Sequence, residues 1–395
     1  MKKLMVLGAG FPQAQLINAA KEMGYATVVC SIPGDYPAFD CADEIAYADI
    51  SDPEAVLAAA KEYAVDGIAT CCLDTGVRAL GYACEKLGFP GLSEAAAVCS
   101  ANKWQMKQAF MAQGVNTARC YQVTEVAALE KALQELSMPV VVKAVDLQGS
   151  KGVYICQTAD DARAAYSEAM ALTRQDFCIV EEYIQGNELG AQAFVYKGEI
   201  VFVLPHGDNT YMSHTAVPVG HYVPIDAGED IQAAAIEQSQ KAIRALGLDN
   251  CAVNIDLIER DGKIYLIELT GRAGATCLVE LVSIWYGIDY FKMIAAMAMG
   301  DDPIAIFNTR SDKRTANASR MLLSEKSGVI RSITDNVTRD ESVYDLSLIV
   351  KEGDRVEKFT NAKDRLGQLI VQGDTAQACF DRIDEILSQL TIEVI

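Results

Sequence analysis

The stretch AVNIDLIERDGKIYLIELTGR, residues 252–272, decides the fold of this chain. It reads as two apolar strands joined by Asp261-Gly262, a dipeptide typical of a tight hairpin turn. An acidic residue interrupts each strand, Asp256 in the first and Glu268 in the second. Acidic residues on hairpins are usually exposed, but a carboxylate inside a buried strand is costly unless it is paired or binds a metal. Two facing carboxylates are hard oxygen ligands of the kind that Mg²⁺ takes alongside phosphate oxygens, so we predict a metal site here.

Another informative segment, basic and rich in glycine, lies upstream of this hairpin. Lys143 ends an apolar strand, and the loop after it contains Gly149-Ser150-Lys151-Gly152. Small residues let backbone N–H groups approach a phosphate closely. The order of residues is not that of a Walker A loop. The alternative is that Lys143 is a solvated charge at the rim of a sheet.

An acidic connector, residues 181–188, follows the next strand. One interpretation is a surface hairpin rich in carboxylates. The other is a strand connector that offers backbone polar groups to a purine, with a carboxylate for the ribose hydroxyls. Downstream of Glu268, the Arg272 guanidinium is suited to gripping a phosphoryl or carboxylate group.

The first ninety residues alternate strand and helix, which predicts parallel strands with covering helices. The turn Gly8-Ala9-Gly10 follows the first strand, but Pro12 intrudes and Gln13 stands where a dinucleotide fingerprint needs its third glycine. A tight strand-to-helix turn therefore fits better than NAD binding.

Further along, the patterns predict a series of helices and strands. Helices are expected at 94–113, 126–136, 159–172, 231–246, 278–299 and 375–390. Strands are expected at 139–145, 153–156, 177–183, 189–196, 199–204, 252–259, 263–269, 342–350 and 368–371.

Length and composition exclude several classes of protein. The chain has 395 residues, of which 51% are hydrophobic and 22% charged, an ordinary balance for two or three folded domains. Its net charge of −20 argues against non-specific binding of nucleic acid or anionic membranes. The apolar stretch 277–299 contains Glu280, Asp289 and Lys292, so we do not expect a membrane span. The twelve cysteines form no CxxC pair, which favours free thiols in a reducing cytosol over a disulfide framework.

The three histidines lie close together in the sequence, at His206, His214 and His221. Their spacing matches no recognised metal motif. Structural or exposed histidines are one interpretation. The other is a substrate-facing loop in which one histidine acts as general base for an amine, with His206 and His214 preferred over His221.

Taken in order, these motifs resemble the ATP-grasp superfamily over about residues 103–299. The resemblance rests on Lys103 after Asn102, the strand ending at Lys143 with its small-residue loop, the 181–188 connector, and the hairpin to Arg272. It implies an N-terminal parallel α/β domain (1–92), a central ATP-grasp domain (93–305) and a small C-terminal α+β domain (306–395), as in biotin-carboxylase-like and carbamoyl-phosphate-synthase-like members.

The resemblance also implies roles for individual residues. Lys103 and Lys143 look like the lysines that hold the ATP phosphates, and Gly149, Ser150 and Gly152 look like part of the mobile lid loop. Glu181 and Ile184 look like the adenine-edge contacts through backbone groups, and Glu188 like the ribose carboxylate. Asp256 and Glu268 look like the Mg²⁺ ligands, and Arg272 like the arginine that steadies the transferred phosphoryl group or the acyl-phosphate.

One position departs from the family's pattern, which usually places an asparagine two residues after the second metal ligand. This chain has Thr270 there, which offers a hydroxyl where an amide carbonyl is expected. Thr270 is therefore a candidate ligand, but a weaker one.

The function implied is that of a cytoplasmic ATP-dependent carboxylate–amine ligase. It would use Mg²⁺, or Mn²⁺ in its place, activate a small carboxylic acid as an acyl-phosphate and release ADP after attack by an amine. The alternatives are a bicarbonate-activating carboxylase, an enzyme like carbamoyl-phosphate synthase, or a non-catalytic nucleotide-binding protein, which Thr270 favours. No nucleic acid or membrane partner is expected, and a homodimer is an expectation by analogy alone.

Overall fold

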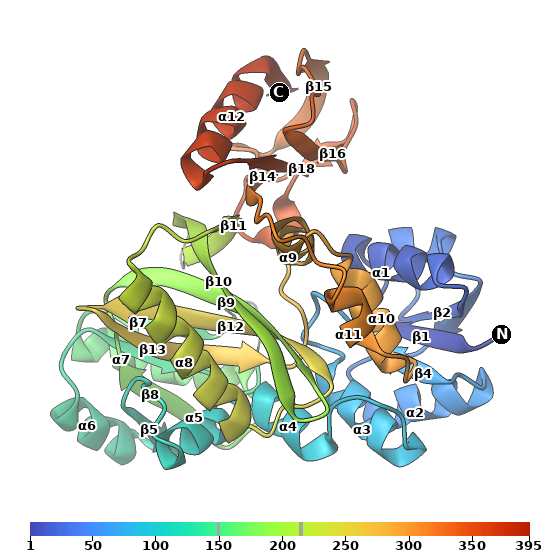
Figure 1. Ribbon diagram of the computed structural model, residues 1–395. Coiled ribbons are helices and arrows are strands. Elements are labelled where there is room, and N and C mark those ends of the chain that lie inside the picture. Colours follow the sequence, from blue (N-terminus) through green and yellow to red (C-terminus); the bar gives the residue numbers. More distant parts are fainter. Residues whose placement is uncertain (148–150, 213–215) are drawn as a thin grey trace. The chain divides into compact units, whose positions relative to one another are not determined.

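The computed structural model describes residues 1–147, 151–212 and 216–395 (Figure 1). The chain divides into two compact units. Unit 1 contains Met1–Leu204, Glu229–Ala275 and Phe291–Ile306, and unit 2 contains Pro205–Gly228, Thr276–Tyr290 and Phe307–Ile395. The predicted division into three domains, with boundaries after residues 92 and 305, stays a prediction.

Unit 1 begins with a four-stranded parallel sheet in the order β3-β2-β1-β4. Its strands are β1 (Lys3–Leu7), β2 (Ala26–Ser31), β3 (Glu44–Tyr47) and β4 (Gly67–Ala69), and its helices are α1 (Phe11–Glu22), α2 (Pro53–Glu62) and α3 (Val77–Leu87). The predicted parallel α/β arrangement is confirmed. The sequence analysis missed β3, a short strand of which only Ala46 is buried.

The next segment of unit 1 has two helices, α4 (Glu94–Ala101) and α5 (Lys103–Ala112), where one continuous helix was predicted. The helix breaks at Asn102, whose backbone is extended and whose side chain accepts a hydrogen bond from the Gln105 backbone N–H, 3.1 Å. This is the N-cap geometry that asparagine favours. As a result, Lys103 becomes the first residue of α5.

An antiparallel sheet in the order β5-β8-β6-β7 follows in unit 1. It is formed by β5 (Cys120–Val123), β6 (Val140–Lys143), β7 (Val153–Cys156) and β8 (Cys178–Glu182), with helices α6 (Val126–Glu135) and α7 (Ala159–Leu172) packed on it. The β5 strand was not predicted. Both Lys143 and Glu181 lie near the ends of their strands, which brings charged groups to the border of this apolar sheet.

The predicted hairpin is confirmed as the edge of a third sheet, part of which lies in unit 1. Its strands there are β9 (Asn187–Tyr196), the first part of β10 (Glu199–Met212), β12 (Cys251–Arg260) and β13 (Lys263–Thr270), with helix α8 (Glu229–Ala245) against β13. Asp261 and Gly262 both have positive φ angles, 53° and 76°, as the tight turn requires. The strand predicted at 199–204 continues to Met212, so β10 runs from unit 1 into unit 2.

The helical region predicted at 278–299 is divided in the structure. Helix α9 (Leu278–Tyr286) ends at Gly287, which adopts the left-handed conformation common at helix C-termini. Helix α10 (Tyr290–Ala298) and the short α11 (Pro303–Phe307) follow. Among the described residues, no helix is both long enough and apolar enough to cross a bilayer.

Unit 2 is built on the end of β10 and further strands, with the order β10-β11-β14-β18-β16. These strands are β11 (Ala216–Val223), β14 (Ala316–Leu322), β16 (Val343–Leu348) and β18 (Gly367–Gly373), and a smaller sheet contains β15 (Gly328–Asp335), β17 (Arg355–Val356) and β19 (Leu390–Val394). Helix α12 (Ala376–Gln389) packs its apolar face, including Ile383 and Ile386, against β14 and β18. This agrees with the predicted α+β character of the C-terminal region.

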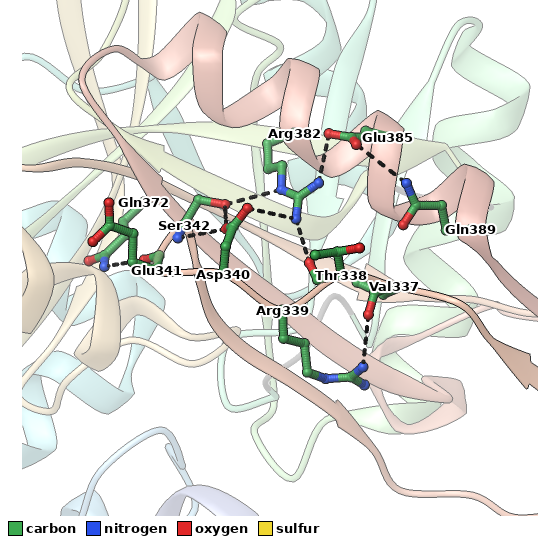
Figure 2. Close-up of polar contacts among 10 residues, drawn as sticks. All are labelled: Val337, Thr338, Arg339, Asp340, Glu341, Ser342, Gln372, Arg382, Glu385 and Gln389. Atoms are coloured by element: carbon green, nitrogen blue, oxygen red, sulfur yellow. Dashed lines mark hydrogen bonds and ion pairs between the residues drawn. The ribbon is translucent and has the colours of Figure 1, made fainter.

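A polar network joins α12 to the loop before β16 (Figure 2). The Arg382 guanidinium donates to the Thr338 carbonyl at 2.6 Å and to Ser342 Oγ at 3.1 Å. It also pairs with Glu385 one turn along the same helix, 2.7 Å. Because this one side chain contacts the loop at Thr338, Ser342 and Asp340, it fixes the path of the loop across the helix.

The cysteines behave as the sequence predicts. All twelve are free thiols, and only Cys41, Cys72 and Cys99 are partly exposed.

Candidate active site

Asp256 and Glu268 lie directly opposite each other on β12 and β13. Side chains at such positions share a face and have their Cβ atoms about 5 Å apart. Asp256 Oδ1 accepts a hydrogen bond from Asn254 Nδ2, 3.0 Å, and Asn254 Oδ1 in turn accepts one from Gln192 Nε2, 2.7 Å. The cross-strand pairing therefore brings together the two carboxylates that the sequence singled out.

Lys103 joins this pair from the start of α5. Its ammonium lies 3.1 Å from Glu268 Oε2 and also donates to the Leu147 carbonyl, 2.9 Å. The positive charge of Lys103 holds the pKa of Glu268 below its usual range. Burial opposes the charged form of Lys103, but Glu268 nevertheless raises the pKa of its ammonium. Both groups are therefore charged at neutral pH.

Lys143 is not a rim charge, because its side chain is buried and forms an ion pair with Glu181. A second lysine, Lys107 of α5, lies 3.2 Å from the other oxygen of Glu181, and both Lys107 and Glu181 are 2% exposed. Burial by itself would raise the pKa of Glu181, but the two lysines hold it at about 2. The result is a buried triad with one anion between two ammonium groups.

The sequence analysis missed Lys107, although the sequence carries a signal for it. On α5 the buried positions are Met106, Lys107 and Phe110. A lysine in the apolar face of a helix must find a partner. Its ammonium donates to Thr117 Oγ1, 2.7 Å, and that hydroxyl donates to the Leu266 carbonyl, 2.7 Å, two residues before Glu268.

Arg272 forms an ion pair with Asp74, 2.6 Å, which the sequence analysis also missed. Asp74 follows β4, and the loop that holds it is joined to the Arg272 segment by a hydrogen bond from Cys72 N–H to the Ala273 carbonyl, 3.0 Å. Burial opposes the charge of Asp74, but Arg272 and a hydrogen bond from Thr270 keep its pKa below the usual value. Thr270 therefore has a carboxylate partner from the N-terminal α/β region.

The remaining predicted nucleotide contacts are placed as follows. Ile184 is buried just after β8, and Glu188 is exposed near the start of β9, where its backbone pairs with Ile258. Gly152 has a positive φ of 71°, and its carbonyl accepts from Ala144 N–H, 2.8 Å. Gly149, Ser150 and His214 lie outside the described residues.

His206 lies in unit 2, where it groups with the buried His221 and the partly buried Asp208. Asp208 Oδ1 lies 2.8 Å from His206 Nδ1 and 2.6 Å from His221 Nδ1. Burial lowers the pKa of His206, so its neutral imidazole is favoured. The structure pairs His206 with His221, the histidine that the sequence analysis ranked last.

The residues around the hairpin fit a magnesium ion in the chemistry of their donors. Asp256 and Glu268 supply carboxylate oxygens from adjacent strands, and the Thr270 hydroxyl follows on β13. Such oxygen donors, together with phosphate oxygens and water, are the ligands Mg²⁺ prefers. Lys103 at 3.1 Å from Glu268 supplies the positive charge that keeps this carboxylate ionised.

Comparisons with known proteins agree with this arrangement. Residues 101–248 match the family model of the phosphoribosylglycinamide synthetase ATP-grasp (A) domain. Residues 320–394 match that of the L-amino acid ligase C-terminal domain 2. The first match contains Lys103, Lys143 and the 181–188 connector.

Solved structures and curated relatives extend the similarity. The structure of a phosphoribosylglycinamide synthetase from Anaerococcus prevotii is 46% identical in sequence, with full coverage of both chains and a TM-score of 0.88. An L-amino acid ligase from Bacillus licheniformis is 18% identical and shares the fold, with a TM-score of 0.85 over 100% of this chain and 99% of that one. The alanine–anticapsin ligase of Bacillus subtilis is 25% identical over 264 residues, which cover 61% of this chain and 55% of the relative. The chain therefore spans about half the length of that relative.

One family assignment follows from the hairpin carboxylates, the lysines near them and the full-length match to a solved relative. The chain belongs to the ATP-grasp superfamily of ligases, as its motifs predicted.

Proposed function

We propose that this protein is an ATP-dependent ligase that joins a carboxylate to an amine and releases ADP and phosphate. The observation that carries the proposal is the facing pair Asp256 and Glu268, with Lys103 bound to Glu268. Mg²⁺ bound there would neutralise charge on the ATP phosphates. The names of the similar proteins favour an amino acid as the substrate that supplies the carboxylate. They include an L-amino acid ligase domain and a phosphoribosylglycinamide synthetase.

The residues of the chain bind and orient in this reaction, and none of them needs to act as a nucleophile. Phosphoryl transfer depends on positioning and on charge neutralisation. Lys103 and Lys143 would contact the phosphates, with Lys143 held in place by Glu181. Ile184, the Glu181 backbone and Glu188 would hold the nucleoside, and Gly149, Ser150 and Gly152 would cover it.

The substrate carboxylate attacks the γ-phosphorus of ATP, and ADP leaves. The amine then attacks the carbonyl carbon of the acyl-phosphate, phosphate leaves, and the nitrogen loses a proton to give the amide. Arg272 would steady the phosphoryl group in both steps, because a guanidinium matches phosphate oxygens in geometry and charge. Asp74 holds that guanidinium in the structure.

The assay measures ADP release with Mg²⁺ and ATP in the presence of amino acids, singly and in pairs, and with hydroxylamine as a trapping amine. We expect ADP release that depends on an amino acid, and a hydroxamate of that amino acid detected by mass spectrometry. If the chain binds ATP but no amino acid or pair accelerates ADP release, the ligase proposal is wrong and a nucleotide-binding role remains.

A variant tests the role of the hairpin. Glu268→Gln keeps the shape of the side chain and removes its charge, so we expect turnover to fall by about 100-fold or more, as for loss of a group that stabilises transition-state charge. The matched control is Glu259→Gln on the same hairpin, whose carboxylate accepts hydrogen bonds from Gly262 N–H and Asn187. Its turnover should stay near that of the native chain. Equal activity of Glu268→Gln and native protein would rule out the metal role.

Mn²⁺ is expected to replace Mg²⁺ in this assay, since both ions accept carboxylate and phosphate oxygens. A homodimer, expected by analogy, and a cytoplasmic location, expected from the free cysteines, belong to the same proposal.

A further inference from the structure

A second group of potential metal ligands lies in unit 2, formed by His206, Asp208 and His221. One ligand atom from each lies within 4.8 Å of the other two. Their side chains are 3%, 12% and 5% exposed, respectively. In the part of the chain that the structure describes, no other cluster of three or more histidine, cysteine or acidic side chains meets this criterion.

The backbone fixes these three side chains on one face of the sheet. Asp208 pairs with His221 across the β10–β11 ladder, and His206 lies two residues before Asp208 on β10. Residues two apart on a strand share a face, as do directly opposite partners. The His221 backbone N–H also donates to Ser319 Oγ on β14, 3.1 Å, which ties the group to a third strand.

The opposite face of the same strands is filled by aromatic rings. The ring of Tyr222 lies where a side chain at position 207 would stand, since a Cβ atom on Gly207 would be 2.0 Å from it. Tyr222 itself packs edge-on against Phe380 of α12, with ring centroids 5.0 Å apart. The ligand atoms are thus carried by a supported sheet, not by a loop.

The group places two imidazoles around one largely buried carboxylate. Asp208 Oδ1 is the common partner of both Nδ1 atoms, and in the described residues the ion pairs of Asp208 are those with His206 and His221. A carboxylate removed from water is stabilised by a cation bound to it. A divalent cation would bind this carboxylate and the two nitrogen donors together.

We propose that His206, Asp208 and His221 form a binding site for a divalent transition metal, with Zn²⁺ as the preferred ion. Two imidazole nitrogens and one carboxylate oxygen are a known ligand set for such ions, and three protein ligands leave one position open for water or a substrate group. In this site each imidazole binds through Nδ1 and carries its proton on Nε2.

The distances allow this with small movements. Zn²⁺ binds nitrogen and oxygen at about 2.1 Å, which in a tetrahedron separates the ligand atoms by about 3.4 Å. The two hydrogen-bonded contacts are now 2.8 Å and 2.6 Å. The ion would therefore replace the shared protons and move the donors apart by less than about 1 Å.

The test measures metal binding to the full chain, prepared without a histidine tag and treated with a chelator. We expect one equivalent of Zn²⁺ per chain, measured by competition with a chromophoric chelator and by elemental analysis. Co²⁺ should bind at the same stoichiometry and give the visible d–d absorption of a low-symmetry site. An intense sulfur-to-cobalt band in its place would assign the ion to cysteines and overturn the proposal.

Variants connect the binding to these residues. Asp208→Asn keeps the size of the side chain and His221→Gln removes one ring. Each should weaken Zn²⁺ binding by about 100-fold or more, because loss of a group that only hydrogen-bonds to a ligand already costs about 10- to 100-fold. The matched control is Asp345→Asn, an aspartate of unit 2 that accepts hydrogen bonds from Ser347 and Gln368. Circular dichroism of every variant shows whether it folds, and His206→Gln serves if Asp208→Asn does not. Unchanged binding in the folded variants would overturn the proposal.

Zn²⁺ binding at this group is tested independently of the ligase reaction. Glu268→Gln alters the hairpin of unit 1 and should bind Zn²⁺ as the native chain does. If Glu268→Gln abolishes binding of the single Zn²⁺ ion while Asp208→Asn retains it, the ion belongs to the hairpin and the proposed site is wrong.

Discussion

Buried charge around Glu181 gives the sharpest prediction at the scale of single residues. Glu181→Gln leaves Lys107 and Lys143 facing each other without their anion, and uncompensated buried charge typically costs about 3–5 kcal/mol. We expect a loss of that size in the free energy of unfolding, measured with urea at pH 7. Glu182→Gln, at a partly exposed neighbour that pairs with Arg260, should cost under about 1 kcal/mol.

The pH dependence of the same variant has a definite sign. The folded-state pKa of Glu181, about 2, lies below the ordinary value of 4.5, so its stabilisation is present above pH 4.5 and is lost as the pH falls toward 2. The difference in stability between native chain and Glu181→Gln should therefore shrink as the pH falls through this window. A difference that stays constant from pH 7 to pH 2.5 would contradict the triad.

For Glu280 of α9 we predict the opposite dependence of stability on pH. Burial raises its pKa from 4.5 to about 7, so the folded state holds a proton that the unfolded chain releases. Stability should fall as the pH rises from 4.5 to 7 and then level off. Each pKa unit corresponds to about 1.4 kcal/mol, so at pH 8 Glu280→Gln should be more stable than the native chain by up to about 3 kcal/mol. This gain should appear as a higher melting temperature.

The comparison for Glu280 is made at two pH values in a calorimeter. At pH 4 the native carboxyl is protonated in both states, and the two proteins should have nearly the same melting temperature. A gain in stability of the same size at pH 4 and pH 8 would show that the effect comes from packing and not from the proton.

Single residues also show what the sequence could and could not predict. Asp256 and Glu268 were predictable because each interrupts an apolar strand on either side of a recognisable turn. Asp74 was not, because its partner Arg272 lies 198 positions away and nothing in the local pattern links them. His221 was ranked last because its position depends on the β10–β11 register. That register brings it opposite Asp208 and cannot be read from the local sequence.

At the scale of elements, the connector between β8 and β9 depends on close approach of two backbones. A Cβ atom on Gly186 would lie 2.1 Å from the Glu259 carbonyl oxygen of β12. Backbone cannot yield as a flexible side chain can, so Gly186→Ala should destabilise the chain by about 1–3 kcal/mol. Gly228→Ala, where no atom lies within 4 Å, should stay within about 0.5 kcal/mol of the native chain by urea unfolding.

Helix α12 supplies a second prediction at this scale. Arg382→Met removes the hydrogen bonds to Thr338 and Ser342 that Figure 2 shows, and we expect the loop before β16 to be cut faster by proteases. Arg331→Met serves as control, since Arg331 is 60% exposed and pairs with Glu393 at the surface. Equal cleavage rates in the two variants would show that the network does not hold the loop.

Strand β14 was not predicted from the sequence, and the reason is physical. Strand β14 has the sequence ANASRML, in which small and polar residues hide the β pattern, although it lies between β11 and β18 and is almost entirely buried. Its place is set by neighbours that are far apart in the sequence. The break at Asn102 was predictable from the sequence, because asparagine followed by a helix-forming segment is a capping signal.

At the scale of the whole molecule, nucleotide binding should stabilise the folded chain by mass action. With free Mg²⁺–ATP at about 100 times its dissociation constant, the gain is about 2.7 kcal/mol, seen as a rise in melting temperature. Lys103→Met should lose most of this rise, because it removes a charge near the proposed phosphates. Lys131→Met, at an exposed position of α6, should keep it, and the same rise in both variants would count against the proposed role of Lys103.

The superfamily and its parallel α/β beginning were predictable, because they depend on local periodicity and on ordered motifs. The division into two units was not predictable, because unit 2 is assembled from three separate segments of sequence. No change of composition or linker marks where the chain passes from one unit to the other.

The path of the chain has a practical consequence. It leaves one unit for the other after Leu204, Gly228, Ala275, Tyr290 and Ile306, and the first of these crossings falls inside strand β10. Neither unit is a continuous stretch of the gene, so no truncation yields one of them whole. Recombination that exchanged one unit for a homologous one would have to replace three pieces at once, which ties the inheritance of the two proposed metal sites together.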